Sequence, residues 1–155
     1  MSPARLLCVL LLAGALGCAL ATNIHVVNKC GFDTDVIYTA NINEHPLPSR
    51  NLGTLRPGGS LQFRPTDTYF NLKNGYGGKT WAEFSINPKT WPGHDSYDLS
   101  VIPGYDIAMQ ILAPFGGFSP ICTYPGCPDA FHYWNDYSKV HVVNSGGTFT
   151  VVFCA

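Results

Sequence analysis

Glycine and proline recur every several residues along this chain. Such frequent turn-forming residues leave room only for short extended elements between them. The chain has 16 glycines and 12 prolines among 155 residues, and both residue types favour turns over the interiors of helices. Between them lie short runs rich in Val, Ile, Thr, Tyr and Phe, which favour β-strands. We therefore predict an all-β protein, a single sandwich of about ten strands, without strong helix signals.

The alternation of apolar and polar residues locates the strands. It is clearest from residue 80 to residue 86, where three apolar residues fall on one face and Trp81, Glu83 and Ser85 fall on the other. Pairs of Gly and Pro mark turns between such runs. The predicted strands cover residues 23–28, 35–40, 60–64, 80–86, 106–112, 139–143 and 147–153.

The first 21 residues have the pattern of a secretory signal peptide. Arg5 supplies a positive charge, an apolar run follows from Leu6, and Ala19–Ala21 forms a small-x-small cleavage signal. The apolar run is too short and too rich in Gly and Ala for a transmembrane helix. We expect a secreted, extracellular protein with one mature domain at residues 22–155.

The charge balance argues against polyanionic partners. The chain has 9 Lys and Arg against 10 Asp and Glu, with a formal net charge of −1. No cluster of basic residues stands out, so nucleic acid and anionic membranes are poor partners. Phosphate-loop, dinucleotide and metal-ligand motifs are not evident in the sequence, so we expect no cofactor and no metal. The length suits one domain, which we expect to be a monomer.

Four cysteines remain after the predicted cleavage: Cys30, Cys122, Cys127 and Cys154. An even number in a secreted protein predicts two disulfides, although the sequence alone permits three pairings. Chain entropy favours joining the first to the last, a link worth about 5 kcal/mol, and a small Cys122–Cys127 loop would add about 2 kcal/mol. A zinc site formed with His132 is the rival interpretation, but the spacing fits no common zinc pattern.

Acidic residues gather between residues 80 and 109. Three of the ten, Glu83, Asp95 and Asp98, fall within sixteen positions among aromatic and β-branched residues. Carboxylates on a charge-poor β surface can bind or cleave a neutral, hydroxyl-rich ligand such as a glycan. The plainer interpretation is that Glu83 faces solvent on an alternating strand and that both aspartates cap backbone amides in turns.

Four segments, in order along the mature region, resemble the thaumatin-like family. They are TNIHVVNKC from Thr22, AEFSIN from Ala82 with the YDLS and GYDIAM that follow it, CPDAFHY from Cys127, and TFTVVFC ending at Cys154. The resemblance implies a thaumatin-like sandwich with disulfides Cys30–Cys154 and Cys122–Cys127. It also implies that a short loop from Pro114 to Cys127 replaces the disulfide-rich second domain of full-length relatives.

The same resemblance implies candidate site residues. Members of the family have an acidic cleft of one Arg, one Glu and three Asp, and several bind β-1,3-glucan. Glu83 matches the cleft Glu, Asp98 matches one cleft Asp, and Asp129 of the CPDAF segment matches another. Asp95 lies close to a further Asp of many relatives, and Arg64 is the candidate for the cleft Arg.

One expected aspartate is missing, because Pro103 stands where the family has it. Three aromatic residues flank the remaining carboxylates and are candidates for stacking on a sugar ring: Trp81, Trp91 and Tyr105. Packing in the core or at an edge is the commoner role of such rings.

Hydrolysis of a glycosidic bond would need two carboxyl groups, with Glu83 as the acid and Asp98 as the base or nucleophile. Because the loss of the second domain removes one wall of the cleft, we expect binding rather than efficient catalysis. The leading hypothesis is a secreted defence or antifungal protein that binds β-1,3-glucan or another cell-wall polysaccharide. The alternatives are a weak endo-β-1,3-glucanase and a protein-interaction module, such as an inhibitor or effector with an extracellular protein partner.

Overall fold

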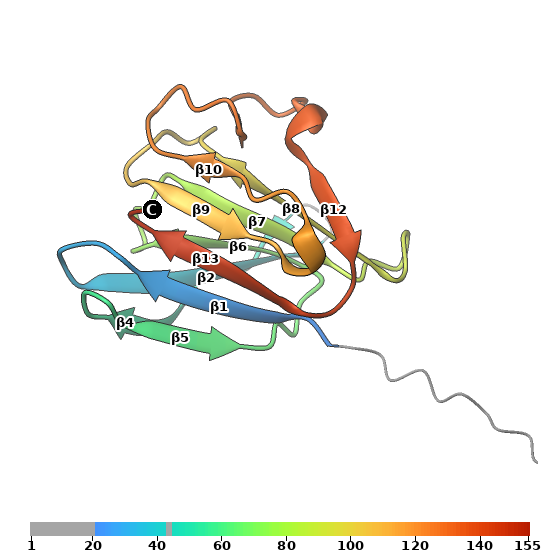
Figure 1. Ribbon diagram of the computed structural model, residues 1–155, viewed down its shortest axis with the longest axis horizontal. Helices are drawn as coiled ribbons and strands as arrows, with labels where there is room; N and C mark the ends of the chain where they lie inside the picture. Colours follow the sequence, from blue (N-terminus) through green and yellow to red (C-terminus); the bar gives the residue numbers. More distant parts are fainter. Residues whose placement is uncertain (1–20, 43–44) are drawn as a thin grey trace, which may run out of the picture.

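The computed structural model describes residues 21–42 and 45–155, so the predicted signal peptide, apart from Ala21, lies outside the described residues. Two β-sheets pack face to face, with the smaller sheet in front in Figure 1. The predicted all-β sandwich is confirmed.

The smaller sheet has five strands in the order β10-β9-β13-β1-β5. The first and last long strands of the fold, β1 and β13, run parallel side by side at its centre, and the other pairs are antiparallel. Its strands are β1 (Asn23–Asn28), β5 (Ser60–Phe63), β9 (Met109–Leu112), β10 (Ile121–Cys122) and β13 (Thr148–Phe153).

The larger sheet has eight strands, with β11-β8-β7-β6-β2-β3 as its main path, while β12 pairs with β8 and β4 pairs with β2. Two 3-10 turns, η1 (Pro114–Gly116) and η2 (Tyr137–Lys139), lie in the connections. The strands are β2 (Thr34–Ile42), β3 (His45–Pro46), β4 (Arg50–Leu55), β6 (Tyr69–Asn74), β7 (Trp81–Ile86), β8 (His94–Ser100), β11 (Ala130–Phe131) and β12 (His141–Asn144).

Each of the seven predicted strands overlaps an observed one, and β1 has the predicted bounds. The prediction for residues 106–112 was too long, because β9 begins only at Met109. The longer strands β4, β6 and β8 were missed. Their sequences are more polar, and β8 in particular carries two aspartates, a residue that β-strands disfavour.

The core between the sheets is a chain of aromatic rings. Phe70 of β6 stacks on Tyr38 of β2 at 4.8 Å and on Phe84 of β7 at 5.1 Å, measured between ring centroids. Phe84 in turn meets Phe149 of β13 edge-on at 5.4 Å, which joins the two sheets. All four side chains are at most 4% exposed, so burial of aromatic surface holds the sandwich together.

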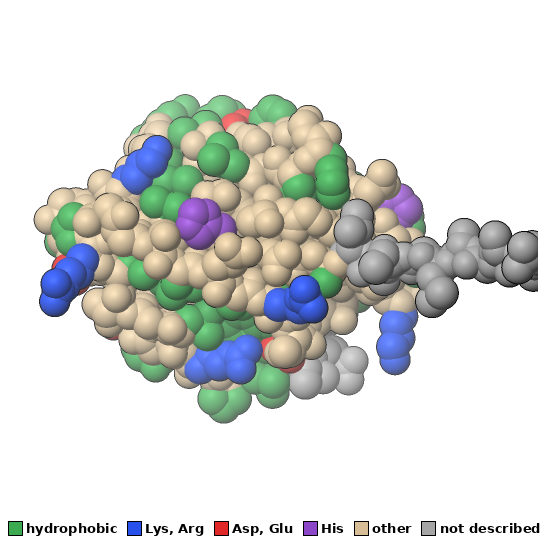
Figure 2. Space-filling view, turned by 60° about the horizontal axis from the view of Figure 1, so that its bottom comes forward, with side chains coloured by type: hydrophobic (Ala, Val, Ile, Leu, Met, Phe, Trp, Pro, Cys, Tyr) green, Lys and Arg blue, Asp and Glu red, His purple; other side chains and the backbone are tan. Residues whose placement is uncertain are grey.

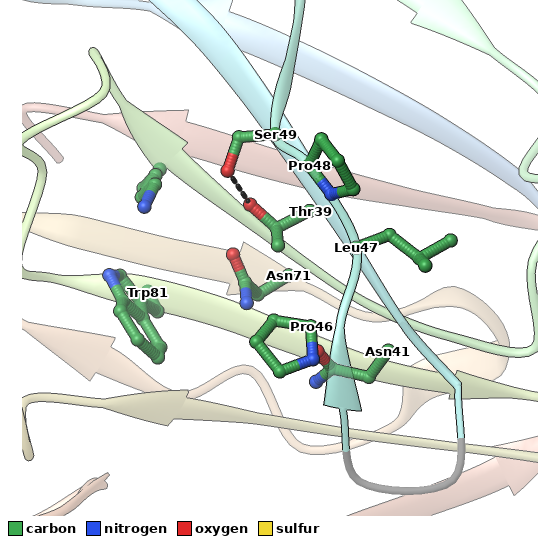
Figure 3. Close-up of a pocket in the computed structure, with 9 residues that line it drawn as sticks. Thr39, Asn41, Pro46, Leu47, Pro48, Ser49, Asn71 and Trp81 are labelled. Atoms are coloured by element: carbon green, nitrogen blue, oxygen red, sulfur yellow. Dashed lines mark hydrogen bonds between the residues drawn. The ribbon is translucent and has the colours of Figure 1, made fainter.

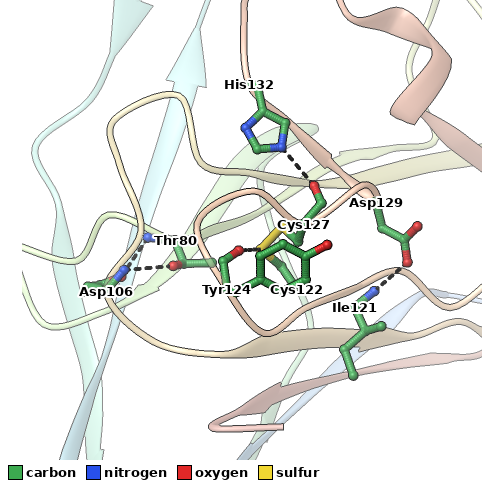
Figure 4. Close-up of a disulfide and its surroundings, with 8 residues drawn as sticks. All are labelled: Thr80, Asp106, Ile121, Cys122, Tyr124, Cys127, Asp129 and His132. Carbon is green, nitrogen blue, oxygen red and sulfur yellow. Dashed lines mark hydrogen bonds between the residues drawn. A yellow bond between two sulfur atoms is a disulfide. The ribbon is translucent and has the colours of Figure 1, made fainter.

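Two disulfides close the fold, and both predicted pairings are confirmed. Cys30–Cys154 joins the chain just after β1 to the chain just after β13. Cys122–Cys127 closes the short loop before β11. Figure 4 shows this second disulfide with His132, whose Nε2 lies 2.8 Å from the carbonyl oxygen of Cys127. The cysteine sulfurs therefore bind each other, and not a zinc ion with His132.

Two further observations concern the residues that the structure describes. Their helices include none with the length and apolar character needed to cross a membrane. They also contain no group of three or more His, Cys, Asp or Glu side chains placed to bind a metal ion. On the face in Figure 2, the Lys and Arg side chains lie apart from one another among mostly uncharged surface.

Candidate functional site

A row of polar side chains crosses the larger sheet at right angles to its strands. Asp98 of β8 lies opposite Glu83 of β7, and Glu83 lies opposite Asn71 of β6. Asn71 lies opposite Thr39 of β2, whose hydroxyl oxygen is 2.7 Å from Oγ of Ser49. Adjacent strands are about 4.8 Å apart, so this polar row spans about 14 Å from Asp98 to Thr39.

Alternation along β7 and β8 directs the two carboxyl groups away from the core. Ala82 and Phe84 flank Glu83 and point into the sandwich, and Tyr97 and Leu99 flank Asp98 in the same way. Successive side chains of a strand point to opposite faces, so Glu83 and Asp98 lie together on the outer face. The predicted face of residues 80–86 and the predicted association of these two carboxyl groups are both seen in the structure.

Burial and mutual repulsion shift the acid–base behaviour of this pair. Burial raises the pKa of Glu83, and hydrogen bonds with Ser100 and Asp98 partly offset this effect. Burial raises the pKa of Asp98 well above its usual range, and both the charge of Glu83 and a hydrogen bond to Glu83 raise it further. These two directions favour a single proton shared by the groups and held on Asp98.

The closeness of the pair limits what it can do chemically. Glu83 and Asp98 are directly opposed on antiparallel strands, where Cβ atoms are about 4.5–5.5 Å apart. Glycosidases that retain configuration hold their carboxyl groups about 5 Å apart, and inverting ones about 6.5–9.5 Å apart. The proximity of this pair leaves little space for a glycosidic bond between the two carboxyl groups. The arrangement suits binding of hydroxyl groups better than cleavage of a glycosidic bond.

Trp81 borders the same face. It precedes Glu83 by two residues on β7, so both side chains point outward. The indole Nε1 donates a 2.9 Å hydrogen bond to the carbonyl of Gly78, which fixes the plane of the ring. Nζ of Lys73 lies 5.3 Å from the ring centroid. Trp81 therefore stands beside the polar row, as the alternation predicted.

Asp95 is placed differently from the prediction. It is completely buried, on the inner face of β8. Its carboxylate accepts hydrogen bonds from the hydroxyls of Thr22 and Ser145 and from the backbone amides of Asn87 and Gly146. These partners come from the start of β1 and from two turns. Asp95 thus links β8 to the start of β1 and to two turns, and it is out of reach of a ligand.

The structure does not bring Asp129 or Arg64 into the polar row. Asp129 Oδ2 accepts a hydrogen bond from the amide of Ile121, which braces the loop of the Cys122–Cys127 disulfide (Figure 4). Arg64 is exposed just after β5, in the other sheet. Arg50, beside Ser49, directs its guanidinium to Asp67 at 3.7 Å.

The two remaining aromatic candidates differ in exposure. Trp91 is 50% exposed in the turn between β7 and β8 and stacks on His94 with ring centroids 4.6 Å apart. Tyr105 packs against the core, and its burial raises the pKa of its hydroxyl, with the neighbouring charge of Asp106 as a second cause. Tyr105 therefore has a packing role, while Trp91 is open to solvent.

Reasoning from the sequence missed Asn71, Thr39 and Ser100. Asn71 is only 4% exposed, and its Oδ1 has no hydrogen-bond partner among the described residues. All three lie on strands, and their place in or beside the polar row depends on which strands pair. No pattern within a single strand could have predicted these positions. The strand β8 itself could have been predicted, because the apolar residues Tyr97 and Leu99 alternate with polar residues along it.

Comparison with known proteins agrees with this architecture. Over 75 residues, 48% of the chain, it is 39% identical to a thaumatin-like protein of Oryza sativa subsp. japonica, of which the match covers 40%. Over the same length it is 37% identical to thaumatin-like pathogenesis-related protein 3 of Avena sativa, of which the match covers 41%. Over this segment the chain is similar to thaumatin-like proteins. The match spans about two fifths of the length of these curated relatives.

Two solved structures share the thaumatin-like fold of this chain. The protein elicitor MoHrip2 from Magnaporthe oryzae superposes with a TM-score of 0.66 at 17% identity, covering 87% of this chain and 100% of that one. The thaumatin-like xylanase inhibitor TLXI superposes with a TM-score of 0.62 at 16% identity, covering 85% of this chain and 99% of that one. No family model matches the chain.

Proposed function

We propose that this is a secreted defence-related protein that binds a neutral cell-wall glycan, with β-1,3-glucan as its ligand. The observation that carries the proposal is the cross-strand Glu83–Asp98 pair on the outer face of the larger sheet, where burial raises both pKa values. The carboxyl oxygens of such a pair can accept hydrogen bonds from sugar hydroxyls. Oδ1 of Asp98 has no protein partner among the described residues.

The composition of the face supports a neutral ligand. Lys73 lies over the ring of Trp81, and the polar row contains amide and hydroxyl groups besides the acidic pair. An anionic polymer would meet the charge of Glu83 without a cluster of Lys and Arg to offset it. An aromatic ring beside hydroxyl-binding groups suits the apolar face of a sugar.

The test is co-sedimentation with insoluble β-1,3-glucan, with released reducing sugar measured in the same tube. We expect the wild type to sediment with the glucan and Asp98→Ala, which has neither acceptor nor donor, to stay largely in solution, with no sugar released by either. Asp33→Ala is the control, because Asp33 is exposed in the turn before β2, away from the polar row. Retention of Asp98→Ala equal to that of the wild type would refute the proposal.

The same assay separates the alternative functions. Release of sugar that Glu83→Gln abolishes would make the protein a glucanase and contradict the argument from the closeness of the two carboxyl groups. The absence of retention on every polysaccharide tested, together with salt-sensitive capture of an extracellular protein, would favour a protein-interaction module.

A further inference from the structure

A hollow of about 680 Å³ opens beside the acidic pair, over the other half of the polar row. Figure 3 shows Asn71 and Thr39 at its floor, Trp81 on one side and the Pro46–Pro48 segment on the other. The volume lies within the roughly 300–1,000 Å³ of small-molecule sites. None of the five residues named for the acidic cleft lines this hollow.

The floor of this hollow contains an unsatisfied acceptor. Asn71 is 4% exposed, yet its Oδ1 has no hydrogen-bond partner among the described residues. A buried polar atom without a partner costs about 1–3 kcal/mol, so such atoms are rare unless something else binds them. Among the described residues, three buried side-chain oxygen atoms have no hydrogen-bond partner. Two of them, in Asn71 and Asp98, belong to the polar row.

The lining restricts the class of ligand. The walls are apolar, since Trp81, Leu47 and two prolines form them, while the floor presents amide and hydroxyl groups. A purely apolar ligand would leave Oδ1 of Asn71 unsatisfied. An anionic ligand would meet only one cation in the lining of the hollow, Lys73. It would also lie near the carboxyl group of Glu83, which is the cross-strand neighbour of Asn71. A pyranose ring offers both an apolar face for the walls and hydroxyl groups for the floor.

We propose that this hollow is a neutral-sugar subsite, in which Asn71 Oδ1 accepts a hydroxyl and Trp81 supports the ring of a glycan residue. The inference rests on the proposed function, because the glycan that enters the hollow is the one that contacts Glu83 and Asp98. Asn71 is the direct cross-strand neighbour of Glu83, so adjacent residues of one glycan chain occupy the hollow and the acidic pair. Affinity should therefore rise with glycan length.

The test is isothermal titration with a disaccharide and a hexasaccharide of β-1,3-linked glucose. Ser49→Tyr places a ring in the hollow from its rim, and Asn71→Ser removes the amide acceptor. We expect the wild type to bind the hexasaccharide at least tenfold more tightly than the disaccharide and each variant to lose most of that gain. Ser60→Tyr, an exposed position on β5 of the other sheet, is the matched control and should bind like the wild type.

The outcomes distinguish this inference from the proposed function. If Asp98→Ala weakens hexasaccharide binding while Ser49→Tyr and Asn71→Ser do not, the subsite is refuted and glycan binding stands. If the wild type binds neither sugar, both proposals fail. Thermal melting of each variant shows whether it is folded, and Ser49→Tyr keeps the test decisive if the buried Asn71→Ser change unfolds the protein.

Discussion

Burial governs the chemistry of Glu83 and Asp98 at the scale of single residues. Each carboxyl group would be an ordinary solvated acid on an isolated strand. Side by side and largely removed from water, they cannot both ionise without cost, because two like charges in contact repel strongly. Their raised pKa values therefore follow from strand pairing, which no single segment of the sequence contains.

The shared proton has a consequence for stability as a function of pH. A carboxyl whose pKa is raised by folding binds more protons in the folded state than in the unfolded state. The free energy of unfolding therefore falls as the pH rises from the ordinary pKa of an Asp, 3.8, through the raised pKa of Asp98. Above the raised pKa this contribution no longer changes with pH. Asp98→Asn abolishes this loss. In urea denaturation from pH 4 to pH 7, we expect the free energy of unfolding of the variant to rise relative to that of the wild type. A difference independent of pH would contradict the shared proton.

Asp95 is the second residue whose position decides its role. Removing its carboxylate leaves the buried hydroxyl of Thr22 and the part-buried donors of Ser145 and Asn87 without this acceptor. With about 1–3 kcal/mol for each donor left unsatisfied, we expect Asp95→Ala to lower the free energy of unfolding by about 3 kcal/mol or more. Asp33→Ala, an exposed control, should change it by less than about 0.5 kcal/mol. Equal stability of the two variants in chemical denaturation would refute this structural role.

At the scale of elements, predictability followed the strength of the local pattern. The sequence of β1 is a β-rich run and β7 alternates cleanly, so both were located closely. In β8 two aspartates hide the alternation, because Asp95 takes an inward position that is usually apolar. The pairing of β8 with β7 creates the candidate site, so a strand that was missed carries half of its acidic pair.

The two disulfides differ in how much chain they close, and their removal should show it. Cys30–Cys154 spans 124 residues of sequence and Cys122–Cys127 spans 5. In the chain-entropy model the first contributes about 5 kcal/mol and the second about 2 kcal/mol. We expect Cys30→Ala with Cys154→Ala to lower the free energy of unfolding more than Cys122→Ala with Cys127→Ala, as measured by chemical denaturation. The opposite order would contradict the entropic account.

At the scale of the whole molecule, the polar row lies on an open sheet face. An open face excludes water poorly and orients a substrate loosely, and both effects raise a hydrolytic barrier. The proposed binding of a long, neutral polymer along this row beside Trp81 would rest on many weak contacts. Such binding should depend little on salt, because it does not use charged partners.

The most direct measurement is the affinity of the protein for a soluble β-1,3-glucan hexasaccharide, with wild type, Asp98→Ala and Asp33→Ala compared by isothermal titration at two salt concentrations. Binding through the acidic pair predicts that the wild type and Asp33→Ala bind equally, that Asp98→Ala binds at least tenfold more weakly, and that salt changes none of these values by more than about twofold. Equal affinity of all three proteins, or no binding by the wild type, would contradict the proposed role of this face.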